Sequence, residues 1–155
     1  MRASILYRAA AVLLFLFAVG HTLGFQESDP AWGVDPALRL MHSTHFTIQG
    51  FTRTYWDFFV GAGFTVGVFY LFAAVLAWQL GSLPGETLAL MRVTAWGFAC
   101  CFAAITVLSV EHLFWIPIIM SSLVTVCLSA AAWRSGNRAG ASAPERKGSS
   151  HQGVA

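Results

Sequence analysis

The chain has 155 residues, of which 57% are hydrophobic and only 10% are charged. Soluble domains carry roughly 25% charged residues, so 9 basic and 7 acidic side chains could not cover a water-exposed globule of this size. The net charge of +2 and the lack of a basic cluster in the sequence exclude a nucleic-acid partner. The composition therefore predicts a small integral membrane protein whose first partner is the lipid bilayer.

Four apolar stretches follow one another at residues 5–25, 55–80, 88–110 and 113–133. Each has roughly the 20 residues that an α-helix needs to cross the hydrocarbon core. Their continuous apolarity favours helices over the alternating strands of a β-barrel. We therefore predict an all-α polytopic membrane protein, with a four-transmembrane-helix bundle over residues 1–133. The first stretch also resembles a secretory signal peptide, but its apolar run continues to Phe25, and we expect it to be retained as a span.

The positive charges predict how the spans are oriented. Seven basic residues precede the first span, flank the link between the second and third, or follow the fourth: Arg2, Arg8, Arg92, Arg134, Arg138, Arg146 and Lys147. Basic residues concentrate on the cytoplasmic side of a membrane, so both termini are expected in the cytoplasm and the spans in the inner (plasma) membrane of a bacterium. Residues 134–155 are rich in Gly, Ser and basic residues, which predicts a disordered cytoplasmic tail.

The connection between the first two spans, residues 26–54, is predicted to contain a short extra helix. Pro36 follows Asp35, which is a favourable start for a helix. Apolar or aromatic side chains then recur at helical spacing as Leu38, Met41, His45 and Ile48. This pattern predicts a helix within residues 35–50, at the outer mouth of the bundle.

Ionisable side chains gather near the outer ends of the spans, although they come from distant parts of the sequence. Ionisable residues at membrane depth usually face the bundle interior and carry function. We therefore predict an outer-facing polar pocket whose ligand-binding residues are His21, Arg53, Trp56, Asp57, Glu111 and His112. Local roles are the alternative: Asp57 could pair with Arg53, and Glu111 could cap the last helix.

Small residues at a spacing of four predict where the helices approach one another. Gly20 and Gly24 lie in the first span, Gly63 and Gly67 in the second, and Ser121, Thr125 and Ser129 in the fourth. Such residues let membrane helices pack closely, and their hydroxyls can form hydrogen bonds between helices.

Two stretches carry a resemblance to known proteins. They are Gly20–His21–Thr22–Leu23–Gly24–Phe25 at the end of the first span and residues 50–59, Gly-Phe-Thr-Arg-Thr-Tyr-Trp-Asp-Phe-Phe, before the second. With Met41 and Phe46 between them, they resemble a family of uncharacterised bacterial four-span integral membrane proteins. The resemblance covers the first half of the chain best. It implies the fold, and it draws attention to His21, Arg53, Trp56 and Asp57 without implying a reaction.

Three functions remain open from the sequence. The first is a membrane bundle that binds a small amphipathic ligand, such as a lipid or a quinone, or a protein partner. The second is a haem or metal protein that uses His21 with His112, or His42 with His45. The third is a component of a proton-coupled transporter or a lipid-modifying enzyme, with Asp57 or Glu111 carrying a proton. The sequence names no cofactor, and assembly of several copies is compatible with all three.

Overall fold

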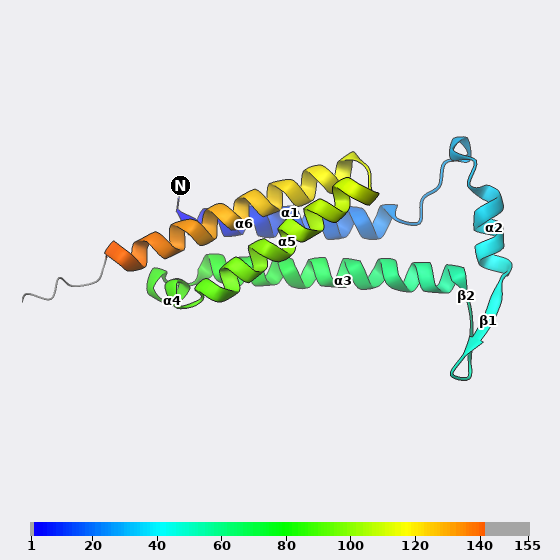
Figure 1. Ribbon diagram of the computed structural model, residues 1–155, viewed down its shortest axis with the longest axis horizontal. Coiled ribbons are helices and arrows are strands. Elements are labelled where there is room, and N and C mark those ends of the chain that lie inside the picture. Colours follow the sequence, from blue (N-terminus) through cyan, green and yellow to red (C-terminus); the bar gives the residue numbers. More distant parts are fainter. Residues whose placement is uncertain (1, 142–155) are drawn as a thin grey trace, which may run out of the picture.

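The structure is a computed structural model that describes the backbone of residues 2–141 and the side chains of residues 2–136. Four long helices form a bundle: α1 (Ala3–Gly24), α3 (Tyr55–Ser82), α5 (Arg92–His112) and α6 (Trp115–Ala141) (Figure 1). All four are long and apolar enough to cross a membrane. The predicted all-α membrane bundle is therefore confirmed.

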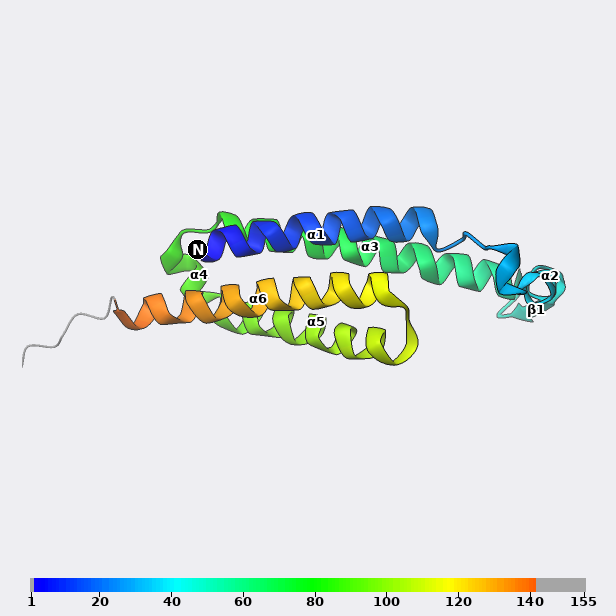
Figure 2. The same ribbon diagram turned by 90° about the horizontal axis from the view of Figure 1, so that it is seen from above.

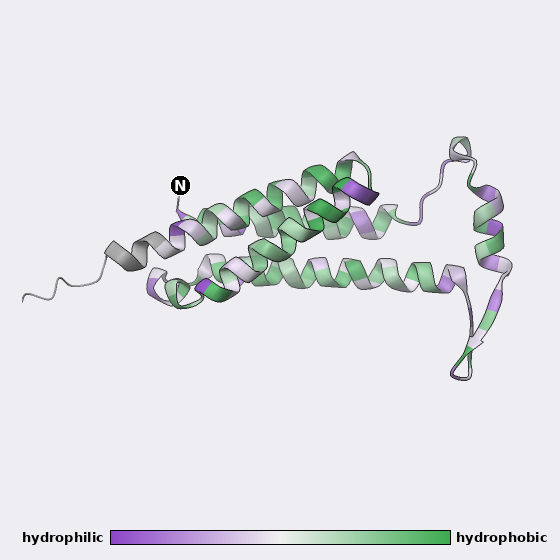
Figure 3. Ribbon diagram, viewed as in Figure 1, coloured by the Kyte–Doolittle hydropathy of each residue, from purple (hydrophilic) through white to green (hydrophobic). Residues whose placement is uncertain are grey.

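The helices form two layers, with α1 and α3 in one and α5 and α6 in the other (Figure 2). Helix α1 packs against both α3 and α6, and α5 packs against α6. The buried core consists mainly of small and aliphatic side chains, such as Ala10, Leu14 and Leu128, together with the aromatic rings of Tyr7 and Phe102. Many large apolar side chains remain exposed on the helices, and colouring by hydropathy shows hydrophobic residues along all four (Figure 3). These outward apolar faces suit a hydrocarbon surrounding.

The ends of the helices differ from the expected boundaries at two places. Residues Gly85–Leu90 form a separate short helix, α4, so that α5 begins only at Arg92. Helix α6 continues to Ala141, and residues 134–141 are therefore helical where the sequence predicted a disordered tail. The rest of that predicted tail, residues 142–155, lies outside the described residues.

The prediction of one helix within residues 35–50 is correct only for its first half. After the short 3-10 helix η1 (Pro30–Trp32), helix α2 spans Asp35–Ser43, and an antiparallel hairpin follows with β1 (His45–Ile48) and β2 (Phe51–Thr54). The turn consists of Gln49 and Gly50, whose φ values are 53° and 84°. Two successive residues with positive φ are typical of a two-residue hairpin turn that matches the twist of the strands. His45 and Ile48 therefore lie in a strand, not on a helical face.

Two groups of charged and polar residues mark the opposite ends of the bundle. One end carries Arg2, Arg8, Arg92 and Arg134, and we call it the arginine end. The other carries the connection with α2 and the hairpin, and we call it the loop end. Helix α3, with 28 residues, is roughly 42 Å long against a hydrocarbon core of about 30 Å. Its excess length extends beyond the ends of α1, α5 and α6 at the loop end (Figure 1).

Glycines of α3 let this helix approach α1 closely, whereas the glycines of α1 do not contribute to the contact. A Cβ atom on Gly67 would lie 2.7 Å from Thr22 Oγ1, and one on Gly81 would lie 3.1 Å from the Ser4 carbonyl oxygen. By contrast, no heavy atom lies within 4 Å of a Cβ built on Gly20 or Gly24, so the predicted packing of these two glycines is wrong. Those two glycines lie on an exposed face of α1.

Between α5 and α6 the predicted hydroxyl contact is present. Thr125 Oγ1 lies 3.0 Å from Thr106 Oγ1, and Thr106 also donates a hydrogen bond to the Phe102 carbonyl at 2.8 Å. Ser121 is fully buried and donates to the Ile118 carbonyl of its own helix. The helix pairs of the two layers therefore contact each other differently. Helices α1 and α3 meet at glycines of α3, and α5 and α6 meet at a pair of threonine hydroxyls.

The close contact at Gly81 predicts a large effect of a side chain there. Gly81→Leu should lower the free energy of unfolding by about 1–3 kcal/mol, because the new atoms meet the α1 backbone and cannot be accommodated without a shift. Gly20→Leu is the matched control and should change it by less than about 0.5 kcal/mol. Denaturant titration of both variants in detergent measures the difference. Equal effects would contradict the close α1–α3 approach at Gly81.

Candidate functional site

His21 lies at the seam between α1 and α3, in the last turn of α1. Its side chain is half-buried, and its Nε2 atom lies 3.0 Å from the carbonyl oxygen of Gly63 on α3. A carbonyl oxygen only accepts hydrogen bonds, so Nε2 must carry the proton and donate it. In the neutral ring the other nitrogen, Nδ1, is then an acceptor. Within the part of the chain whose side chains are described, Nδ1 has no hydrogen-bond partner.

The local sequence explains why this contact forms. Gly63 has no side chain, and a Cβ atom there would overlap the ring of Phe25. Phe25 follows His21 by one helical turn, and the two rings stack with centroids 5.3 Å apart. The missing side chain of Gly63 thus admits the Phe25 ring to α3, while its carbonyl accepts the hydrogen bond from His21.

Aromatic rings continue from His21 in both directions along the bundle. We call this set the aromatic column; it consists of His42, Trp56, Phe59, Phe25, His21 and Tyr70. Centroids of successive rings are 4.4 to 6.4 Å apart, within or close to the range of favourable aromatic pairs. At its inner end Tyr70 contacts Phe102 of α5 at 6.2 Å. The aromatic column therefore connects α2, α3 and α1, and it reaches the second layer through Tyr70.

Asp57 has a local structural partner. The Thr54 backbone N–H donates to Asp57 Oδ2 at 2.8 Å, and the Asp57 N–H donates to Thr54 Oγ1 at 3.1 Å. This reciprocal pair is a capping box, which satisfies two of the otherwise unpaired donors at the start of α3. Asp57 is exposed, and Arg53 lies instead over the ring of Phe51 at 5.6 Å. The local role of Asp57 is therefore helix capping.

Glu111 and His112 lie in the last turn of α5, in the other layer of the bundle (Figure 2). Glu111 Oε2 and His112 Nε2 are 3.7 Å apart, and the two side chains are 59% and 69% exposed. Such an exposed neighbouring pair contributes little stability. Neither residue contacts His21 in the described part of the chain, so the structure does not bring these three side chains together.

Of the predicted ligand-binding residues, the aromatic column links only two. Trp56 contacts His42 directly, and it reaches His21 through Phe59 and Phe25. Arg53, Asp57, Glu111 and His112 have other partners, as described above. The sequence argument missed Phe25, Phe59 and Tyr70 because aromatic residues are common in all four spans. Their spacing is a usable signal: Phe25 lies four residues after His21, and Phe59 three after Trp56.

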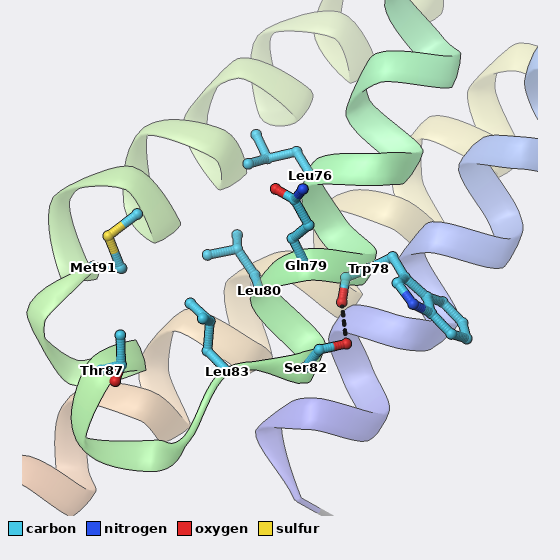
Figure 4. Close-up of a pocket in the computed structure, with 8 residues that line it drawn as sticks. All are labelled: Leu76, Trp78, Gln79, Leu80, Ser82, Leu83, Thr87 and Met91. Carbon is cyan, nitrogen blue, oxygen red and sulfur yellow. Dashed lines mark hydrogen bonds between the residues drawn. The ribbon is translucent and has the colours of Figure 1, made fainter.

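A cavity lies at the arginine end, away from the predicted outer pocket. It measures about 470 Å³ and lies between the end of α3, the link to α4 and the start of α5 (Figure 4). Leu76, Leu80, Leu83 and Met91 line it, and none of the predicted ligand-binding residues does.

The histidines proposed as metal ligands have separate partners. His42 stacks on Trp56, and His45 Nδ1 lies 2.9 Å from the Ser43 carbonyl oxygen. Among residues 2–136, no three His, Cys, Asp or Glu side chains form a group suited to a metal ion. The side-chain arrangement at the loop end therefore favours hydrogen bonding and aromatic contact.

No protein-family model, curated protein or solved structure matches the chain.

The capping role of Asp57 can be separated from a role of its charge. Asp57→Ala should destabilise the first turn of α3 by about 1 kcal/mol, because the Thr54 N–H loses its acceptor. Asp57→Asn keeps an acceptor oxygen and should cost less. Hydrogen exchange of the amides of residues 54–58 measures both, with Ser28→Ala, in the exposed segment between α1 and η1, as the control. An equal loss in the Asn and Ala variants would show that the charge, not the hydrogen bond, matters.

Proposed function

We propose that the protein is a membrane-embedded binding protein for a small amphipathic molecule whose head group donates a hydrogen bond. The observation that carries the proposal is the hydrogen bond from His21 Nε2 to the Gly63 carbonyl oxygen. It fixes the ring orientation and leaves Nδ1 as an acceptor at the seam of α1 and α3. A hydroxyl group is a suitable partner for such an acceptor.

The surroundings of His21 suit the apolar part of such a molecule. Leu23, Phe59 and Phe64 are exposed on α1 and α3, and Phe64 contacts the ring of Phe25 at 5.3 Å. Ligand sites commonly combine apolar and aromatic walls with a few well-placed polar groups. A lipid alcohol or a quinol has this combination, with one or more hydroxyl groups on an apolar body.

The membrane and the orientation are part of the same proposal. The described basic residues at the arginine end support a cytoplasmic location of that end, with the candidate site facing outward. The resemblance of the two stretches around His21 and Trp56 supports a bacterial inner membrane. Assembly of several copies is compatible with the exposed apolar faces of α3.

The two alternative functions receive less support from the contacts. His21 and His112 belong to different layers and have different partners, which does not favour a shared haem. The Asp57 carboxylate accepts a hydrogen bond in the capping box, and the Glu111 side chain is exposed. Neither observation favours a proton relay through the bundle. A hydrogen-bonding site at His21 uses a polar side chain whose hydrogen bond joins α1 to α3 near the loop end.

The proposed site predicts a preference between two closely related probes. A short-chain quinol can donate a hydrogen bond to His21 Nδ1, whereas the matching quinone has only acceptors. The protein in nanodiscs should bind the quinol about fivefold more tightly than the quinone, as expected for one neutral hydrogen bond. Calorimetry or quenching of tryptophan fluorescence under anaerobic reducing conditions measures the quinol arm.

Matched variants assign the preference to one atom. His21→Gln places an amide N–H where it can reach the Gly63 carbonyl but removes the acceptor at Nδ1, so the preference should disappear. His112→Gln changes an exposed histidine in the other layer and should leave it intact. Equal binding of quinol and quinone by the unmodified protein, or an unchanged preference in His21→Gln, would refute the proposal.

A further inference from the structure

A second cavity at the arginine end lies between α5 and α6. It measures about 160 Å³ and is lined by Arg92 and Trp96 of α5 and by Ala132, Trp133 and Gly136 of α6. One arginine and two tryptophans thus line a small space where two membrane spans end. Tryptophan is typical of this depth, at the boundary between hydrocarbon and head groups.

The Arg92 side chain lies against α6. A Cβ atom built on Gly136 would be 3.7 Å from both Nε and Cζ of Arg92, so the guanidinium lies over the glycine. Among the residues with described side chains, no carboxylate forms an ion pair with Arg92. The planar guanidinium is therefore left with donors that suit the oxygen atoms of a phosphate group.

We infer that this cavity binds the phosphate of an anionic phospholipid, with Arg92 as its main ligand. Charge supports this occupant, because the described arginine end carries Arg2 and Arg8 besides Arg92, and Glu86 is its single described carboxylate. Basic pockets between membrane helices on the positively charged side are suited to anionic head groups. The indole N–H groups of Trp96 and Trp133 supply further donors beside the guanidinium.

We expect part of the lipid to occupy the apolar cavity at the same end of the bundle. Met91, the residue before Arg92, lines the cavity of about 470 Å³ together with Leu76, Leu80 and Leu83. Figure 4 shows these side chains between α3 and the start of α5, with Gln79 beside them. An acyl chain is the apolar group that a bilayer supplies at this position. This site is at the opposite end of the bundle from His21 and does not depend on the function proposed there.

Lipid competition tests the inference on the full chain. Protein in detergent is mixed with equal amounts of phosphatidylglycerol and phosphatidylcholine, and native mass spectrometry gives the ratio of the two bound lipids. The unmodified protein should retain phosphatidylglycerol in excess. Arg92→Gln should lower that ratio about tenfold, the change expected for loss of a charge-assisted hydrogen bond. The matched control, Arg39→Gln, removes an exposed arginine of α2 at the loop end and should leave the ratio unchanged.

A second variant covers the case in which Arg92→Gln does not fold. Gly136→Glu places a carboxylate over the guanidinium of Arg92, keeps the arginine and should also abolish the excess. An equal ratio in the unmodified protein, or an excess that persists in both variants, would overturn the inference. Displacement of phosphatidylglycerol by millimolar glycerol phosphate would also overturn it, because the site would then take a soluble phosphate rather than a lipid.

Discussion

Membrane helices gain no hydrophobic free energy when they meet, because lipid tails are as apolar as their own side chains. The bundle therefore depends on how closely its helices pack, and the α1–α3 seam shows the closest described approach. Gly63, Gly67 and Gly81 of α3 allow it by presenting backbone, rather than side chains, to α1. The constraint is strictest at Gly81, where a Cβ atom would meet the α1 backbone. At Gly63 and Gly67 it would meet the side chains of Phe25 and Thr22.

The same constraint produces the candidate site. The His21 ring can reach the Gly63 carbonyl because the two helices lie so close at this level. A carbonyl in an α-helix normally accepts a hydrogen bond only from the amide four residues later. The Gly63 carbonyl is also within hydrogen-bond distance of a side chain from another helix. The close packing and the polar contact therefore both depend on Gly63. His21 satisfies a hydrogen bond across the seam, while the Phe25 ring occupies the space that a side chain on Gly63 would fill.

The sequence predicted the four spans because about 20 apolar residues in a row have few other interpretations. It failed at His45 and Ile48, which fit both a helical spacing and a strand. The Gln49–Gly50 pair, which suits a hairpin turn, was the deciding signal. Site prediction selected residues by their rarity in apolar segments, and so it included Asp57 and Glu111, whose described partners are one to three residues away. The partner of His21 is a backbone carbonyl 42 residues away, which no local pattern reveals.

The length of α3 sets the depth of the candidate site. Gly63 lies eight residues after the start of α3 at Tyr55, which corresponds to roughly 12 Å along the helix. The same helix exceeds the hydrocarbon thickness by about 12 Å, and this excess extends at the loop end. If all of this excess lies outside the hydrocarbon, His21 is close to the boundary with the head groups, and Trp56 and His42 are beyond it. A molecule with a polar head and an apolar body would match both sides of that boundary, which is the ligand class of the proposed function.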